Sequence, residues 1–301
     1  MRAITFAEYG GPDVLRVSDV PVPEPGPGQV RVAVRRAGVN PIDWKIRRGF
    51  MADGAPLDGP QIPGMEIAGV VDAVGDGAAF SVGDEVFGWS DTGAYAEFAL
   101  SKAVARKPAD LSWEDAAALP VAGETALRVL RLLDVKPGEL LVVHGASGAV
   151  GRFAVQAAIE TGSTVIGTAG QRNLDEVKSL GAIAVSYGDG WLKRVREAAG
   201  GRAVDAVFDT SGHGVLPDSV ELRGSQERVV TIADPAAFQL GLPFSSGGDA
   251  LSDETLDRIL GYVERGLRIP QGTSYPLEEA ADAQEESENG HPSGKLTIVV
   301  S

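Results

Sequence analysis

Hydrophobic positions in the first 118 residues form short runs that alternate with polar positions and are separated by glycine and proline. Alternation with a period of two, bounded by turn residues, is typical of half-buried strands. Helices do not alternate with these strands in the pattern, so this part of the chain is expected to be β-rich. The predicted strands lie within residues 2–10, 14–25, 29–40, 65–75, 84–90 and 94–102.

The pattern changes near residue 119. Apolar runs then alternate with segments of helical periodicity, which predicts βαβ units around a parallel sheet. Residues 239–244, QLGLPF, are interpreted as an edge strand able to pair across a dimer. The other predicted strands are 140–143, 163–170, 183–186, 204–208 and 228–232, and the predicted helices are 152–162, 171–180 and 191–199.

The segment from residue 251 onward predicts a helix at 252–266, a shorter helix at 276–287 and a final strand at 295–300. We expect this last strand to rejoin the sheet of the first region. The fold class is therefore α/β, with a doubly wound parallel sheet and a β-rich second domain. The β-rich domain is assigned to residues 1–118 and 251–301, and the parallel-sheet domain to residues 119–250.

A glycine-rich turn follows the first strand of the predicted parallel sheet. Leu140 to Val143 form an apolar strand, and helical periodicity begins after Gly151. In the register of the G-x-G-x-x-G fingerprint, Ala146 stands at the first glycine position. Such a turn brings backbone amides and a helix N-terminus to a pyrophosphate, although it can also simply join a strand to a helix. The residues expected to bind the dinucleotide here are Ala146, Ser147, Gly148, Ala149, Val150 and Gly151.

The end of the next strand distinguishes between the two nicotinamide dinucleotides. NAD-binding sites place an acidic side chain there to bind the ribose hydroxyls. This chain instead continues with Ala169, Arg172 and Asn173, and the first carboxylate is Asp175. We therefore expect NADP(H), with Arg172 near the 2′-phosphate. The alternative is that Arg172 is an ordinary solvated residue near the start of a helix.

Composition narrows the function classes. Of the 301 residues, 44% are hydrophobic, and the net charge of −15 disfavours nucleic acid or an anionic membrane as the main partner. No apolar run approaches the length of a membrane span, and no signal-peptide pattern is present, so we expect a cytoplasmic protein. Without cysteine there is no disulfide or thiolate, and the three histidines lack metal-ligand spacing. We expect no metal.

Motifs spread over nearly the whole chain carry a family resemblance: MRAITFAEYGGPDVLRV, AGVNPIDWKIRRG, PGMEIAGVV, VGDEVFG, GAYAEF, the glycine turn and SENGHPSGKLTIVV. Together they resemble zinc-free members of the medium-chain dehydrogenase/reductase superfamily, close to NADPH-dependent quinone oxidoreductases and enone reductases. The resemblance implies a GroES-like catalytic domain built from both chain ends, a Rossmann domain between them, and an active cleft where the two meet. It also implies a homodimer.

The sequence departs from the zinc alcohol dehydrogenases of that superfamily at the metal positions. Asn40 and Asp43 stand in the first region, and Met65 precedes Glu66 where those enzymes have a histidine. A reaction without a Lewis acid suits an acceptor that is already activated, such as a quinone or an α,β-unsaturated carbonyl. Its developing oxyanion then needs a hydrogen-bond donor from the protein.

The resemblance to enone reductases implies that Asn40 and Lys45 are the catalytic residues. Lys45 would stabilise the oxyanion, and Asn40 would bind the nicotinamide ribose or the substrate carbonyl. The alternatives are a solvated Lys45 beside Arg47 and Arg48, and a turn residue at Asn40. Asp43 is expected to pair with a backbone group or an arginine.

Four further cofactor contacts are carried over from similar enzymes. Tyr187 is expected at the 2′-phosphate, with a plain surface residue as the alternative. Ile232 and Ala233 are expected near the nicotinamide, and Lys295 matches the closing GK of the family. His144 is expected to be structural. Trp89 and Phe50 are candidates for an apolar substrate pocket, although aromatic residues more often pack in a core or at a rim.

These observations predict an NADPH-dependent, metal-independent reductase of a small-molecule quinone or enone. Two alternatives remain open. One is an enoyl-thioester reductase, which turnover of a thioester would distinguish. The other is a non-catalytic NADP(H)-binding sensor or structural protein, which would bind NADPH without oxidising it.

Overall fold

The computed structural model describes residues 1–247, 251–290 and 294–301. The chain forms two compact units, called here unit 1 and unit 2. Unit 1 comprises Met1–Val121, Leu251–Gly261 and Ile269–Ser301, whereas unit 2 comprises Ala122–Ala250 and Tyr262–Arg268. Unit 1 is therefore assembled from distant parts of the sequence, whereas unit 2 is nearly continuous.

Unit 1 is built on a seven-stranded sheet whose main path runs β13-β14-β3-β4-β5-β7, with β6 also paired to β3. The C-terminal strand β14 runs antiparallel to β3, which confirms that the last strand rejoins the first region's sheet. A separate hairpin pairs β1 (Arg2–Thr5) with β2 (Arg16–Asp19). The sheet strands are β3 (Val30–Gly38), β4 (Glu66–Val74), β5 (Glu85–Trp89), β6 (Phe98–Ser101), β7 (Val104–Arg106), β13 (Gln271–Pro276) and β14 (Lys295–Val299).

Short helices in unit 1 are the main feature that the hydrophobic pattern did not predict. Helix α1 (Pro41–Arg47) has only seven residues, too few to establish a helical period, and a capping box formed by Asn40 and Asp43 starts it. Helix α2 (Trp113–Ala118) has six residues and is capped by Ser112. In contrast, the helix predicted at residues 276–287 is present, as η3 (Leu277–Glu279) followed by α10 (Ala280–Glu288), and η1 (Pro12–Val14) is a further short piece.

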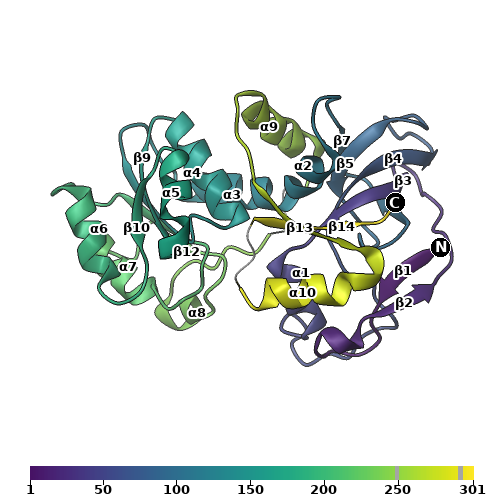
Figure 1. The fold of residues 1–301 in the computed structure, drawn as a ribbon, viewed down its shortest axis with the longest axis horizontal. Helices are drawn as coiled ribbons and strands as arrows, with labels where there is room; N and C mark the ends of the chain where they lie inside the picture. Colours follow the sequence, from purple (N-terminus) through teal and green to yellow (C-terminus); the bar gives the residue numbers. More distant parts are fainter. Residues whose placement is uncertain (248–250, 291–293) are drawn as a thin grey trace. The chain divides into compact units, whose positions relative to one another are not determined.

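Unit 2 contains a five-stranded parallel sheet in the order β10-β9-β8-β11-β12, with helices on both faces (Figure 1). The order reverses at β8, where a doubly wound fold binds ligands at the carboxyl ends of its strands. All five strands lie at the predicted places. They are β8 (Leu140–His144), β9 (Thr164–Ala169), β10 (Ile183–Ser186), β11 (Ala206–Asp209) and β12 (Val229–Thr231).

The helices of unit 2 connect these strands in the expected alternation. Helices α6 and α7 pack against each other, and α4 packs against β8 and β9. The bounds are α4 (Ala149–Glu160), η2 (Gln171–Asn173), α5 (Leu174–Ser179), α6 (Trp191–Ala199), α7 (Leu216–Arg223) and α8 (Ala236–Leu240). Two more helices, α3 (Pro120–Leu132) and α9 (Asp253–Glu264), contain residues of both units.

The predicted edge strand at residues 239–244 is wrong. Residues up to Leu240 belong to helix α8, which ends because Gly241 adopts the left-handed conformation at φ +66°. Phe244 alone forms a bridge to Thr231 of β12. The alternation of Leu and Gly looked strand-like, but alanines and a proline just before it start a helix instead.

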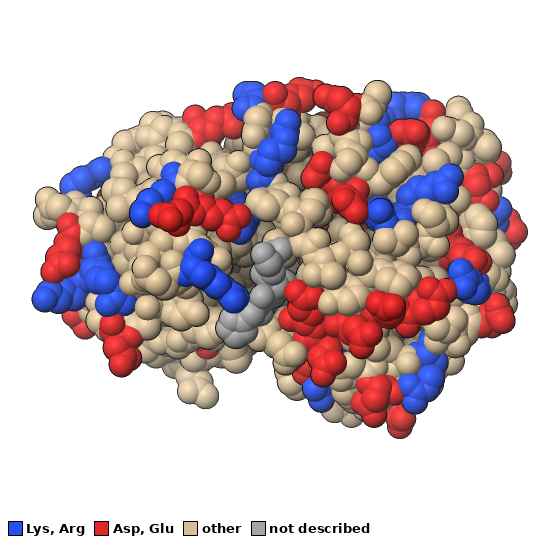
Figure 2. Space-filling model, viewed as in Figure 1, with Lys and Arg blue, Asp and Glu red and all other residues tan. Residues whose placement is uncertain are grey.

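The surface of unit 1 carries much of the acidic excess. Acidic side chains gather over α10 and the 3₁₀ helix before it (Figure 2). The acidic residues of α10 and of the 3₁₀ helix before it are Glu278, Glu279, Asp282, Glu285, Glu286 and Glu288.

In the parts of the chain that the structure describes, no helix is long and apolar enough to cross a bilayer.

Candidate functional site

The glycine turn between β8 and α4 has the close backbone packing that the fingerprint predicts. Gly145 lies at φ +74°, and a Cβ atom there would lie 2.5 Å from the hydroxyl oxygen of Thr210. A Cβ atom at Gly151 would lie 2.2 Å from the carbonyl oxygen of Gly145. Neither position has room for a side chain, so the turn depends on both glycines.

The N-terminus of helix α4 has no side-chain cap. Its N-cap residue is Gly148, which offers no side chain to the free amides, and no acidic residue lies in the first turn. Two side chains from outside the turn hold Ser147. Arg152 donates to its carbonyl oxygen at 2.6 Å, and Asn173 donates to its hydroxyl at 3.3 Å. Ala149 and Val150 occupy the first turn of the helix. Such an end suits a pyrophosphate.

The carboxyl end of β9 brings together three of the predicted cofactor residues. The amide of Tyr187 donates to the carbonyl oxygen of Ala169 at 3.0 Å, and the Tyr187 ring lies 3.3 Å from where a Cβ atom of Gly170 would be. Arg172 follows two positions later and is exposed. It makes no hydrogen bond or ion pair with any other residue the structure describes, so its guanidinium is available to an anion.

Arg194 on helix α6 fixes the loop that carries Tyr187. Its guanidinium donates to the carbonyl oxygens of four successive residues at 2.8 to 3.2 Å. Sequence reasoning missed this residue, because the contact depends on how the helix returns to the loop. The four accepting residues are Ser186, Tyr187, Gly188 and Asp189.

A buried carboxylate organises the loops after β11 and β12. One oxygen of Asp209 accepts from the amide and hydroxyl of Ser211, and the other accepts from the hydroxyl of Thr231 at 2.8 Å. Ile232 and Ala233 are half-buried, and their amides donate to the Asp209 carbonyl and the Thr231 hydroxyl. These two amides are therefore occupied, which leaves packing and the carbonyl groups for a ligand.

A second polar cluster lies inside unit 1. The side-chain amide of Asn40 donates to Glu66 at 2.8 Å, and its oxygen accepts from the Lys295 ammonium at 2.5 Å. Lys295 also lies 2.5 Å from the same oxygen of Glu66, and all three residues are buried. The structure thus turns Lys295 inward, and one amide hydrogen of Asn40 has no partner among the residues that the structure describes.

Asp43 extends this cluster. One carboxylate oxygen accepts from the Asn40 backbone amide at 2.8 Å and from the Tyr95 hydroxyl at 2.9 Å, which confirms the expected backbone pairing. Burial raises the pKa of the Asp43 carboxyl to about 7, because the low-dielectric interior disfavours its charged form. The pKa of the Tyr95 hydroxyl is raised well above its ordinary value, mainly by burial and then by the Asp43 charge.

Lys45 differs from its basic neighbours. Its ammonium lies 5.7 Å from the centre of the Trp44 ring, and partial burial lowers the pKa of the Lys45 amine. It makes no ion pair with another residue in the described part of the chain. Arg47 is fully buried and donates to Gln284 and Glu288 of α10, which anchors α1. Lys45 is thus a partly desolvated donor on a fixed helix.

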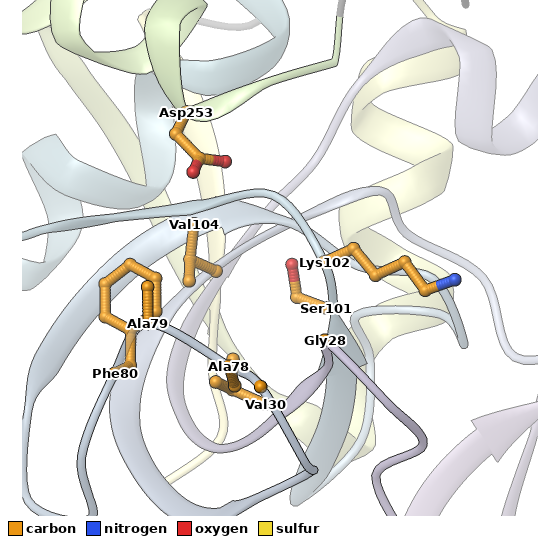
Figure 3. Close-up of a pocket in the computed structure, with 10 residues that line it drawn as sticks. Gly28, Val30, Ala78, Ala79, Phe80, Ser101, Lys102, Val104 and Asp253 are labelled. Carbon is orange, nitrogen blue, oxygen red and sulfur yellow. The ribbon is translucent and has the colours of Figure 1, made fainter.

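Unit 1 also contains a small cavity of about 200 Å³ (Figure 3). Phe80, Val104 and Asp253 line it, and the side chain of Lys102 points away. The cavity is smaller than the roughly 300 Å³ of a typical ligand pocket. No predicted site residue is among the described residues that surround it.

Comparisons with known proteins agree with this geometry. Two family models match: the alcohol dehydrogenase GroES-like domain over residues 26–109 and the zinc-binding dehydrogenase over residues 149–246. The quinone oxidoreductase of Rattus norvegicus is 35% identical over 322 aligned positions, which cover 98% of this chain and 96% of that protein. The chain belongs to the medium-chain dehydrogenase/reductase family.

Two further members of the medium-chain dehydrogenase/reductase family show the range of named activities. The 2-methylene-furan-3-one reductase of Solanum lycopersicum is 33% identical, with 99% of this chain and 79% of that protein covered. The structure of the Escherichia coli quinone oxidoreductase complexed with NADPH matches with a TM-score of 0.87 at 26% identity, and each chain is covered completely.

In this medium-chain dehydrogenase/reductase the residues do not fit the zinc that one matching family model is named for. The sequence has no cysteine, and Glu66 is paired with an ammonium rather than with other metal ligands. No group of three or more candidate ligands occurs among the residues the structure describes.

His144 is structural, as the sequence indicated, but it does have hydroxyl partners. Its two ring nitrogens lie 3.0 Å from the Thr168 hydroxyl and 3.2 Å from the Ser219 hydroxyl. Burial lowers the pKa of His144 to about 4, so the ring is neutral at physiological pH. It packs edge-on against Trp191.

Proposed function

We propose that this protein is an NADP(H)-dependent, metal-independent oxidoreductase that reduces a quinone or an α,β-unsaturated carbonyl. The observation that carries the proposal is the glycine turn between β8 and the uncapped N-terminus of α4, with the unpaired, exposed Arg172 after β9 where NAD enzymes have an acid. The named activities of the two relatives described above support the acceptor class.

The cofactor is assigned to residues at the carboxyl ends of the unit 2 strands. Ala146 to Gly151 would hold the pyrophosphate through backbone amides, and Arg172 and Tyr187 would hold the 2′-phosphate. Asn173 supports the turn through the Ser147 hydroxyl. Ala169, Ile232 and Ala233 would border the ribose and nicotinamide by packing.

Bound NADPH supplies the hydride, and the chain must stabilise the oxygen that becomes negative. We assign this task to Lys45, because its ammonium is partly desolvated and makes no ion pair within the described chain. Asn40 would keep its remaining amide hydrogen for the ribose or the carbonyl. We assign Lys295 to positioning Asn40, and this role takes the place of the direct cofactor contact expected for Lys295 from the sequence.

We also propose that the protein is a cytoplasmic homodimer. Phe238 is 72% exposed and stacks on Phe244 at 5.2 Å beside the edge strand β12, which leaves an apolar surface next to a sheet edge. Light scattering tests the dimer, with Phe238→Ser as the variant expected to shift it towards monomer. Fractionation of the source cells tests the location.

The decisive experiment follows absorbance at 340 nm anaerobically after chelator treatment, with NADPH and NADH compared. The acceptors are 1,4-benzoquinone, 9,10-phenanthrenequinone, a simple enone and a crotonyl thioester. Chelator-resistant turnover that favours NADPH with a quinone or enone supports the proposal. Preference for the thioester supports an enoyl-thioester reductase. NADPH binding without turnover of any acceptor indicates a sensor or structural protein.

A further inference from the structure

Two aromatic side chains meet above the carboxyl end of the unit 2 sheet. The rings of Tyr187 and His213 are parallel within 2°, with centroids 6.3 Å apart. Tyr187 follows β10 and His213 lies in the loop after β11, and the sheet order places β9 and β8 between those strands. At about 4.8 Å per strand, the two strands are roughly 14 Å apart. The side chains therefore converge over the ends of β9 and β8.

Hydrogen bonds to buried or partly buried side chains hold the backbone of both loops that carry the rings. Arg194 donates to the carbonyl oxygens on either side of Tyr187 as well as to its own. Asp209 accepts from the amides of Ser211 and Gly212, the two residues before His213. The backbones of both loops are thus held by hydrogen bonds, which limits the entropy lost when a planar group binds to the two rings.

The position of the pair relative to the two phosphate sites identifies its ligand. The Tyr187 ring lies against Gly170, two residues before the unpaired Arg172, and the glycine turn follows β8. In NADP(H) the 2′-phosphate and the pyrophosphate are joined through the adenosine ribose. A molecule that reaches both sites therefore carries its adenine to the surface between them, where the two rings lie.

We propose that Tyr187 and His213 together form the surface on which the adenine ring of NADP(H) stacks. The inference rests on the proposed NADP(H) binding and adds His213 as a contact residue. Tyr187 is 58% exposed and His213 is exposed, so both rings are accessible to a base. Parallel aromatic rings are the geometry that base stacking uses, and every adenine nucleotide offers the same π-face.

The test measures dissociation constants by calorimetry for NADPH, NADH, ADP-ribose and nicotinamide mononucleotide. His213→Ala should weaken the three adenine-containing ligands by a similar factor, about 5- to 20-fold, because stacking on one exposed ring is lost. Binding of the mononucleotide, which has no adenine, should be unchanged. His213→Phe should restore most of the affinity, and the melting temperature of the free protein should not change, since the side chain is exposed.

The outcomes separate this inference from the proposed function. A loss confined to NADPH would place the imidazole on the 2′-phosphate and overturn the stacking role. Unchanged affinity for the adenine-containing ligands in His213→Ala would also overturn the stacking role, as would an equal loss of affinity in His213→Phe. Neither result would contradict NADP(H) binding itself. A wild-type protein that binds neither dinucleotide would refute the proposed function and the inference together.

Discussion

The ammonium of Lys295 lies 2.5 Å from a carboxylate oxygen of Glu66, with both side chains buried in unit 1. Removing the cation would leave the buried carboxylate with hydrogen bonds from the Asn40 side chain and the Val121 amide but with no opposite charge. Lys295→Met is therefore expected to lower the free energy of unfolding by about 3–5 kcal/mol, as measured by urea denaturation. The double variant Lys295→Met/Glu66→Gln should recover more than half of that loss. A single-variant loss below about 1 kcal/mol would contradict the pairing.

The glycines of the turn allow stability and cofactor affinity to be separated. Gly151→Ala should destabilise unit 2 by several degrees of melting temperature, because the new Cβ would lie 2.2 Å from a carbonyl oxygen. Gly148→Ala is the matched control, since its Cβ would lie 3.5 Å from the same oxygen and its φ is −78°. We expect it to fold normally but to bind NADPH at least about tenfold more weakly, because the methyl group blocks the pyrophosphate. Equal stability of both variants would count against the packing argument.

Arg172 should determine the choice between the two dinucleotides. Arg172→Ala is expected to raise the dissociation constant of NADPH by about 10- to 100-fold, the value of one charged hydrogen-bonded contact, and that of NADH by less than about twofold. Arg172→Lys should retain part of the preference, since a lysine still offers a point charge. Fluorescence titration of both cofactors measures the difference. Equal weakening of NADPH and NADH would remove Arg172 from the phosphate site.

Lys45 should affect turnover more than cofactor binding. Lys45→Ala is expected to lower kcat by about 100-fold with NADPH affinity nearly unchanged, because one oxyanion donor is lost. Arg48→Ala, which removes an exposed neighbouring cation, is the control. Burial lowers the pKa of the Lys45 amine, so wild-type kcat should fall as the pH rises through that lowered pKa, and the variant should lack this fall. A kcat that is unchanged in Lys45→Ala would make it a surface residue.

Asp43 should make stability depend on pH. Burial raises the pKa of this carboxyl from 3.8 to about 7, so between those pH values the folded protein keeps a proton that the unfolded chain has released. The free energy of unfolding therefore falls as the pH rises through this window, by at most about 4 kcal/mol for this group.

The comparison of wild type with Asp43→Asn isolates that contribution. Urea denaturation at pH 5 and pH 8 should show a smaller decrease for the variant, since an amide does not ionise. Asp175→Asn, at a side chain that is 96% exposed, should behave like wild type. If Asp43→Asn and wild type lose equal stability between the two pH values, the carboxyl is already ionised at pH 5.

Features that repeat along the chain were predictable from the sequence. The parallel strands, the glycine turn and the returning strand β14 each have a local period or a turn residue that fixes them. Helix α1 was not predictable, because seven residues do not complete two helical turns. Residues 239–244 misled the prediction because a left-handed Gly241 ends a helix inside an alternating pattern.

The candidate site was predictable only where its residues are neighbours in sequence. The turn from Ala146 to Gly151 needs no tertiary information, whereas the approach of His213 to Tyr187 depends on the order of the strands. The inward direction of Lys295 depends on Glu66, a residue in a distant part of the chain. Long-range pairings of this kind leave no periodic signal.

Lys295 and Asn40, which meet in unit 1, are separated by 255 positions in the chain. During translation β3 therefore lacks its β14 neighbour until the whole parallel sheet of unit 2 has been synthesised. Domains form in the order in which their segments leave the ribosome. Nucleotide-binding capacity should thus arise on the nascent chain before the residues around Asn40 are assembled. Until β14 is made, the end of β3 that it covers, Arg36 to Gly38, remains an unpaired edge at which a growing chain can mispair.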